Sequence, residues 1–273
     1  MSFYRLSAAV GLALCIAVPS SQAQTVRAAG TGIGIALVRI LAESYERDHP
    51  GAKILVPESV GTGGAIKGLE SGKIDVGILA RPLAAGEVEQ GVAITLCRTA
   101  LVFFTSAARK DVSLTRQDLP ALFTASLPAF AAGEVRMLLR PPTDTGFIRL
   151  VESFPELSPV IAAAREARGA NLALTDQDAM DAVEASRSLV AFGAMAPLLA
   201  EKRKLSVIAL DGITPGIAGL ENGRYPYFLP VVLALGSKSS EGARRFLDYA
   251  VSAAAAPVLR ANGCLPATAR QYP

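Results

Sequence analysis

Three short segments rich in glycine and hydroxyl residues are the parts of this sequence best suited to binding a small anion. They are Gly-Thr-Gly-Ile-Gly at 30–34, Gly-Thr-Gly-Gly at 61–64 and Thr-Asp-Thr-Gly at 143–146. Each is expected to open a helix, where unpaired backbone N–H groups and the positive end of the helix dipole point at one spot. Taken singly, such segments are also ordinary tight turns. The first lacks the third glycine of a dinucleotide fingerprint, and the second lacks the Lys-Ser/Thr ending of a nucleotide-binding loop.

Two arginines accompany these segments. Arg140 follows an expected strand and directly precedes the third segment. Its guanidinium could give two parallel, charge-assisted hydrogen bonds to an oxyanion, and the alternative is an ion pair with Asp144. Arg81, beside Pro82, is expected either to steer anions from the rim of a cleft or to have a structural role.

The sequence shows no arrangement typical of a catalytic site. Hydrolysis needs a nucleophile beside a base, or a cluster of metal ligands. The one histidine, His49, stands at an apparent helix end, where interaction with the helix dipole explains it. The carboxylates are scattered, and the cysteine spacing does not resemble a zinc site. The sequence therefore predicts a binding protein, without cofactor or metal, rather than an enzyme.

The elements that must position these residues alternate between short apolar strands and amphipathic helices, which predicts an α/β fold with a mainly parallel sheet. Strands are expected at 25–29, 53–57 and 74–79, with helices after the first two glycine segments. Both segments then leave strand ends at the same edge of one sheet. In open α/β sheets, ligands bind at that carboxyl edge.

A second lobe is predicted beyond the extended run 96–106, and a second extended run, 227–235, would return the chain to the first lobe. Within the second lobe we expect strands at 135–140, 189–192 and 205–210, and helices at 147–153, 160–168 and 178–185, the last capped near Thr175 and Asp176. A final helix is expected at 243–251. The predicted division is residues 24–98 with 226–273 in lobe 1, and residues 99–225 in lobe 2.

Residues 1–23 have the pattern of a cleaved secretory signal peptide. Arg5 precedes an apolar run from Leu6 to Val18, and Ala23 ends a small-residue cleavage site. That run is shorter than the roughly 20 residues needed to cross a bilayer. Cys15 follows Leu14, whereas a lipoprotein site needs a small residue there. The expected location is therefore the periplasm.

Charge and cysteine content limit the partners. The chain has 27 basic and 24 acidic residues, and loss of Arg5 with the signal leaves 26 basic residues. Nucleic-acid binding is not expected at so small a net charge, because it requires a basic face or stripe. Cys97 and Cys264 would remain after cleavage, and in an oxidising compartment they form either a disulfide or two buried thiols.

Several motifs resemble the phosphate-binding component of bacterial phosphate ABC transporters. They are Gly30-Thr31-Gly32, the run from Gly61 to Leu83, Leu210-Asp211-Gly212-Ile213-Thr214-Pro215, Gly223-Arg224-Tyr225-Pro226 and Asn262-Gly263-Cys264-Leu265-Pro266. The run from Gly61 to Leu83 is the most specific, and the resemblance covers nearly the whole chain after the signal.

The resemblance implies a two-lobed periplasmic-binding-protein fold of type II, with two extended hinge segments and the ligand held between the lobes. It also implies a monomer that delivers an inorganic anion to a membrane ABC permease. The anion would be bound by residues of the three segments and by Arg140, with Arg81 at the rim: Thr31, Gly32, Ile33, Thr62, Gly63, Asp144, Thr145 and Gly146.

Two departures from that family bear on the ligand. Ala80 stands where the family has an aspartate that accepts the proton of hydrogen phosphate, and Asp144-Thr145-Gly146 replaces a Ser-Gly-Thr run. A carboxylate acceptor favours a ligand that carries a proton and repels one that does not. Our hypothesis is that Asp144 restores an acceptor from the opposite lobe.

Phosphate is the leading ligand, with sulfate, molybdate and tungstate as alternatives. A second functional reading is a periplasmic subunit that presents its ligand to a membrane receptor kinase, and a third is a secreted hydrolase of phosphate esters.

Overall fold

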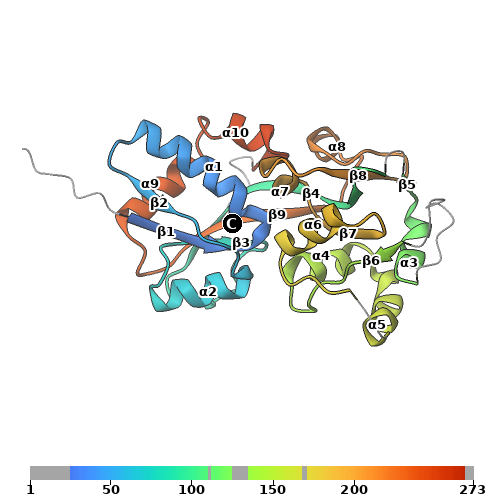
Figure 1. The fold of residues 1–273 in the computed structure, drawn as a ribbon. Coiled ribbons are helices and arrows are strands. Elements are labelled where there is room, and N and C mark those ends of the chain that lie inside the picture. The colour runs from blue at the N-terminus through green and yellow to red at the C-terminus, as the bar shows by residue number, and fades with distance from the viewer. Residues whose placement is uncertain (1–24, 110–111, 125–134, 168–170, 268–273) are drawn as a thin grey trace, which may run out of the picture.

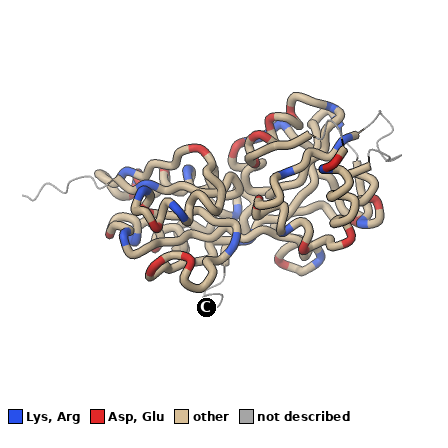
Figure 2. Tube along the Cα trace, turned by 90° about the horizontal axis from the view of Figure 1, so that it is seen from below, with Lys and Arg blue, Asp and Glu red and all other residues tan. Residues whose placement is uncertain are grey.

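The computed structural model describes residues 25–109, 112–124, 135–167 and 171–267, which form two α/β lobes side by side (Figure 1). The expected signal peptide lies outside these residues. None of the helices in the described ranges is both long enough and apolar enough to cross a membrane. Basic and acidic positions are interspersed along both lobes (Figure 2).

The first lobe is built on a parallel arrangement of three short strands. Strand β1 lies between β2 and β3, with Thr25 opposite Lys53 and Ala28 opposite Val76. The elements are β1 (Thr25–Gly30), α1 (Gly32–Asp48), β2 (Lys53–Leu55), α2 (Gly61–Ser71) and β3 (Val76–Leu79). Helices α1 and α2 therefore both begin at the carboxyl edge of this sheet.

Gly30 sets the geometry of that edge. A Cβ atom at this position would lie only 1.8 Å from the carbonyl oxygen of Ile78, so no other residue fits. The close approach lets Thr31 N donate to Ile78 O at 2.9 Å. The start of α1 is thereby attached directly to the end of β3.

The long strand β4 (Val92–Ser106) runs through both lobes (Figure 1). Its first part pairs antiparallel with β9 (Phe228–Leu235) and β10 (Cys264–Pro266), and its last part pairs with β7 (Leu189–Ala194) and β8 (Leu205–Leu210). The strand order is β2-β1-β3-β9-β4-β7-β6. The chain crosses back just before β9.

The second lobe packs helices around the end of β4. Its remaining elements are β5 (Ser113–Leu114), α3 (Leu119–Leu122), β6 (Arg136–Met137), α4 (Thr145–Ser153), α5 (Ser158–Glu166), α6 (Asp176–Ala185), α7 (Met195–Ala200) and α8 (Ile217–Glu221), with 3-10 turns at Arg116–Asp118 and Pro155–Leu157. Helices α9 (Glu241–Ala250) and α10 (Ala256–Ala261) return to the first lobe (Figure 1).

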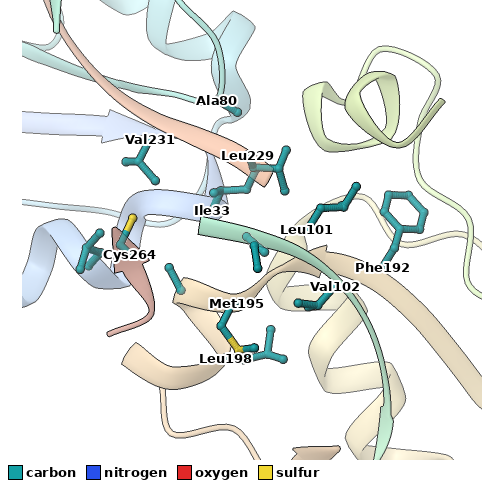
Figure 3. Packing of buried hydrophobic residues seen from close by; sticks show 14 of the residues in the cluster. Ile33, Ala80, Leu101, Val102, Phe192, Met195, Leu198, Leu229, Val231 and Cys264 are labelled. Atoms are coloured by element: carbon teal, nitrogen blue, oxygen red, sulfur yellow. The ribbon is translucent and has the colours of Figure 1, made fainter. Parts of the chain in front are cut away.

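The main hydrophobic core is continuous across the junction of the lobes. Figure 3 shows Leu229 of β9 and Leu101 of β4 between the two halves, with Met195 of α7 nearby. Cys97 and Cys264 form a disulfide that joins β4 to β10. The junction is thus a packed part of the protein rather than a linker.

Several elements differ from the sequence-based expectations. Helix α2 begins at Gly61 itself, so the segment expected as a loop is the first turn of the helix. The strand expected at 135–140 contains only Arg136–Met137. Helix α7 was not expected, because Met195–Ala200 is uniformly apolar and carries no amphipathic period.

Candidate functional site

Four helices begin around one cavity of about 400 Å³, which takes residues from both lobes. Their N-caps are Thr31 for α1, Val60 for α2, Asp144 for α4 and Thr175 for α6, and all four line the cavity. Each helix presents its positive dipole end and its first, unpaired N–H groups there. The arrangement is therefore suited to negative charge.

Helix α1 offers backbone donors with no internal partner. Its N-cap, Thr31, makes no side-chain capping bond. No acceptor for the N–H groups of Gly32 and Ile33 exists among the described residues, and the first local bond is Gly34 N to Thr31 O at 3.1 Å. These two N–H groups are available to an anion.

Helix α2 is fixed beside α1 by the same glycine that anchors β3. Val60 N donates to Gly30 O at 3.0 Å, and Ser59 Oγ donates to the same oxygen at 3.2 Å. Thr62 is buried, and its Oγ1 accepts from Ala80 N at 3.2 Å. Because Oγ1 is the acceptor in that bond, its own proton can be donated to a ligand.

Arg140 is the cation of the site and is only 3% exposed. Its Nη2 donates to Asp144 Oδ2 at 2.8 Å, and Nη1 lies 3.7 Å from Asp176 Oδ1. Desolvation lowers the pKa of Arg140, but Asp176 and Asp144 outweigh it, so the pKa is raised and the group stays charged. Nε and Nη1 are buried without a hydrogen-bond acceptor in the described structure. Donors left like this are costly unless a ligand accepts from them.

The carboxylate of Asp144 accepts hydrogen bonds from two groups of the second lobe. Its Oδ1 accepts from Phe147 N at 2.9 Å, which caps α4, while Oδ2 pairs with Arg140. The ion pair that the sequence offered as an alternative is therefore present. Each oxygen of the Asp144 carboxylate thus already accepts one hydrogen bond, and the role of Asp144 as acceptor of a ligand proton stays a prediction.

Asp176 is a second carboxylate in the site, at the first position of α6. Burial raises its pKa to about 6; Arg140 lowers the pKa, whereas Asp144 and Glu201 raise it. Its side chain is 12% exposed and lines the cavity. Asp176 therefore changes charge close to neutral pH.

Gly32 lets the two lobes meet beside that carboxylate. A Cβ atom at Gly32 would lie 2.4 Å from Gln177 Oε1 and 2.7 Å from Asp176 Oδ2. Gln177 Nε2 also donates to Gly32 O at 3.3 Å. The absence of a side chain at Gly32 thus allows α6 to approach α1.

Most of the predicted site residues come together. Those that line the cavity are Thr31, Thr62, Gly63, Arg140, Asp144 and Thr145. Gly32, Ile33 and Gly146 are buried in the first turns of α1 and α4 and are not among the lining residues. Arg81 does not line this cavity: its guanidinium pairs with Glu87 through bonds of 2.7 and 2.5 Å, and it lines a neighbouring cavity between the lobes.

The chemical role of Asp176 was not expected from the sequence, in which Thr175 and Asp176 indicated only a helix cap. The structure has a capping box there, in which Thr175 Oγ1 accepts from Asp178 N at 3.0 Å. A cap followed by a helix is the same signal that marked the other three segments. Applied once more, it would have brought α6 into the site.

Comparisons with known proteins support this architecture. A family model described as the PBP superfamily domain matches residues 17–254. No curated protein matches the chain.

Among solved structures, a putative phosphate ABC transporter substrate-binding protein with bound phosphate from Clostridium perfringens is 12% identical. It has a TM-score of 0.76 and covers 90% of this chain and 100% of its own. An ABC-type phosphate transport receptor from Vibrio cholerae is 16% identical, with a TM-score of 0.60 over 89% of this chain and 100% of its own. The effector-binding domain of BenM with benzoate is 16% identical, with a TM-score of 0.52 over 83% and 90% of the two chains. These likenesses confirm the expected two-lobed type II fold, which carries different ligands in different proteins.

Proposed function

The chain belongs to the PBP superfamily, and from this we propose that it is a periplasmic solute-binding protein that holds a small oxyanion, phosphate foremost, between its lobes. The observation that carries the proposal is the convergence of four helix N-termini on a cavity that also contains the buried, incompletely bonded Arg140. A phosphate or similar anion would accept from Arg140 and from the free N–H groups of α1.

The charges of the site favour an anion that brings a proton. Arg140 faces two carboxylates, Asp144 and Asp176, so the ionised side chains do not by themselves attract a dianion. The helix dipoles supply the missing positive potential, and a proton on Asp176 or on the ligand removes one repulsion. Phosphate carries such a proton near neutral pH and sulfate does not, which supports phosphate over sulfate.

Ligand capture would use motion about the two crossings between the lobes. These are β4 and the segment that leads into β9, and we place lobe 1 at residues 24–98 with 226–273 and lobe 2 at residues 99–225. Closure around the anion would create the form that a membrane permease of an ABC importer recognises. The names of the phosphate-transport neighbours from C. perfringens and V. cholerae support this partner.

We also propose that the protein is secreted and that it does not catalyse a reaction of its ligand. The Cys97–Cys264 disulfide is typical of an oxidising compartment, in agreement with the expected signal peptide. In the described ranges no group of three or more His, Cys, Asp or Glu residues could hold a metal ion. We expect a monomer that binds its ligand and does not transform it.

Isothermal titration of the mature protein with phosphate, sulfate, molybdate and tungstate tests the proposal. We expect one phosphate per chain, bound more tightly than sulfate at pH 8. If none of the four anions binds, the oxyanion assignment is wrong.

A further inference from the structure

A second cavity, of about 420 Å³, adjoins the first and is not used by the proposed oxyanion site. Thr145 lines both cavities. The second is lined by residues of both lobes. Five of these residues are apolar, including Ile148 and Phe228, and four are charged: Arg81, Arg98, Arg149 and Glu152. It therefore lies between the lobes, next to the anion site.

The cavity depends on a β-bulge in β4. The pairing of β4 with β9 shifts between Thr95 and Cys97, so that Thr95 and Arg98 both line the cavity. Bulges commonly redirect side chains beside functional sites. Cys97, between them, forms the disulfide with Cys264 instead.

Arg98 forms no ion pair among the described residues, and Glu152, the carboxylate that lines the same cavity, pairs with Arg149. The guanidinium carbon of Arg98 lies 5.2 Å from the centre of the Phe228 ring. Its Nε is buried without an acceptor, and no carboxylate in the described structure pairs with it. A buried donor of this kind is stabilised when a ligand supplies the acceptor.

Arg149 contacts the same aromatic ring but has hydrogen-bond and ion-pair partners within the protein. Its guanidinium carbon lies 5.2 Å from the same Phe228 ring. However, its Nη1 pairs with Glu152 at 3.0 Å and its Nε donates to Phe228 O at 3.2 Å. Of these two arginines, Arg98 is thus the one whose charge has no carboxylate partner among the described residues.

Residue 80 connects the two cavities. Ala80 lines the second cavity, and its N–H donates to Thr62 Oγ1, which lines the first. Only a methyl group projects from this position. Each cavity has the size of pockets that hold organic ligands, which commonly occupy about 300–1,000 Å³. In this conformation of the protein, a single inorganic ion would leave most of the space of the two cavities unfilled.

We infer that the ligand is an organic phosphate: a phosphate monoester that carries a carboxylate. Its phosphoryl group occupies the first cavity, its carbon skeleton contacts Phe228 and Ile148, and its carboxylate binds Arg98. This inference rests on the proposed function of the first cavity and names the substrate class of the combined site.

Titration calorimetry with inorganic phosphate, phenyl phosphate and 4-carboxyphenyl phosphate tests the inference on the mature protein. We expect 4-carboxyphenyl phosphate to bind at least tenfold more tightly than inorganic phosphate, with phenyl phosphate between them. Weaker binding of both esters than of phosphate would overturn the inference and leave the oxyanion proposal intact. Failure of all three ligands to bind would reject both.

Two variants locate the organic part of the ligand. Arg98→Gln should remove the advantage of the carboxylated ester over phenyl phosphate and leave phosphate affinity unchanged. Ile148→Trp, at a position that is 44% exposed and tolerant of a larger side chain, should fill the second cavity and weaken both esters at least tenfold, but not phosphate. Thermal unfolding checks that each variant folds. If Ile148→Trp folds and binds both esters like the unmodified protein, the second cavity does not hold the ligand.

Discussion

The two lobes contribute chemically different walls to the anion cavity. The first-lobe wall, which comprises Thr31, Thr62 and the N-termini of α1 and α2, has no charged side chain among its lining residues. The second-lobe wall carries Arg140, Asp144 and Asp176. Helix dipoles and hydroxyl groups bind anions of different charge, whereas ionised side chains discriminate between the protonation states of a ligand. We infer that the first wall provides general anion affinity and the second selects the charge of the ligand.

The largest effect is expected from Arg140→Gln, which removes the only cation of the charged wall. Charge-assisted hydrogen bonds contribute about 1.5–3 kcal/mol each, so phosphate affinity should fall on the order of 100-fold. The two partly buried carboxylates also lose their partner, and the free energy of unfolding should fall by about 3–5 kcal/mol. Calorimetry and chemical denaturation measure the two effects.

Arg47→Gln is the matched control, because Arg47 is exposed near the end of α1 and, among the described residues, its side chain bonds only Ser44 Oγ. It should change neither quantity. Unaltered phosphate binding in Arg140→Gln would show that the charged wall does not contact the anion.

Gly32→Ala should separate the walls without changing a charge. The new Cβ would overlap Gln177 Oε1 and Asp176 Oδ2, at 2.4 and 2.7 Å, and would push α6 away from α1. We expect about tenfold weaker phosphate binding, because the two walls must approach each other to share one ligand. Gly216→Ala is the control away from the cavity, since a Cβ there meets nothing within 4 Å. Equal affinity of the two variants would contradict this role for Gly32.

Asp176 should make anion binding depend on pH. Sulfate keeps its charge between pH 5 and 8, so a change in its affinity reports on the protein. Ionisation of Asp176 above its pKa of about 6 adds a negative charge beside Arg140. Asp144 and Glu201 act directly on Asp176, and Asp178 acts on Arg140. Sulfate affinity should therefore fall as pH rises, by up to about tenfold per unit. Asp176→Asn should bind sulfate with little pH dependence, whereas Asp181→Asn, an exposed control, should behave like the unmodified protein.

The same carboxyl affects stability in the free protein. Its pKa in the folded state is raised above the ordinary value of 3.8. The folded state therefore binds this proton more tightly than the unfolded chain does, and the stabilisation is lost as pH rises through about 6. Asp176→Asn should flatten this part of the curve of unfolding free energy against pH.

Thr62→Val tests the uncharged wall and should have the smallest effect. It removes one neutral hydroxyl donor, and a neutral hydrogen bond contributes about 0.5–1.5 kcal/mol, which corresponds to roughly three- to tenfold in affinity. The loss should be similar for phosphate and sulfate, as measured by calorimetry. A change confined to one anion would show that this wall also discriminates.

The sequence predicted the parts of the site that rest on local patterns. The glycine segments at 30–34 and 61–64 indicated helix starts at one sheet edge, and Arg140 was placed beside the third segment. Burial and long-range contacts were not visible: the partner of Arg81 is Glu87, and Asp176 reaches the site only because α6 packs against Gly32. The second cavity depends on a β-bulge in β4, and no local sequence pattern predicted that bulge.

The central claim, that both walls hold one anion, is tested most directly by following backbone amide resonances during a phosphate titration. We predict that Gly32 and Ile33 of the first wall and Thr145 and Gly146 of the second shift together, with a single dissociation constant. Shifts confined to one wall, or to residues away from the cavity, would contradict the account.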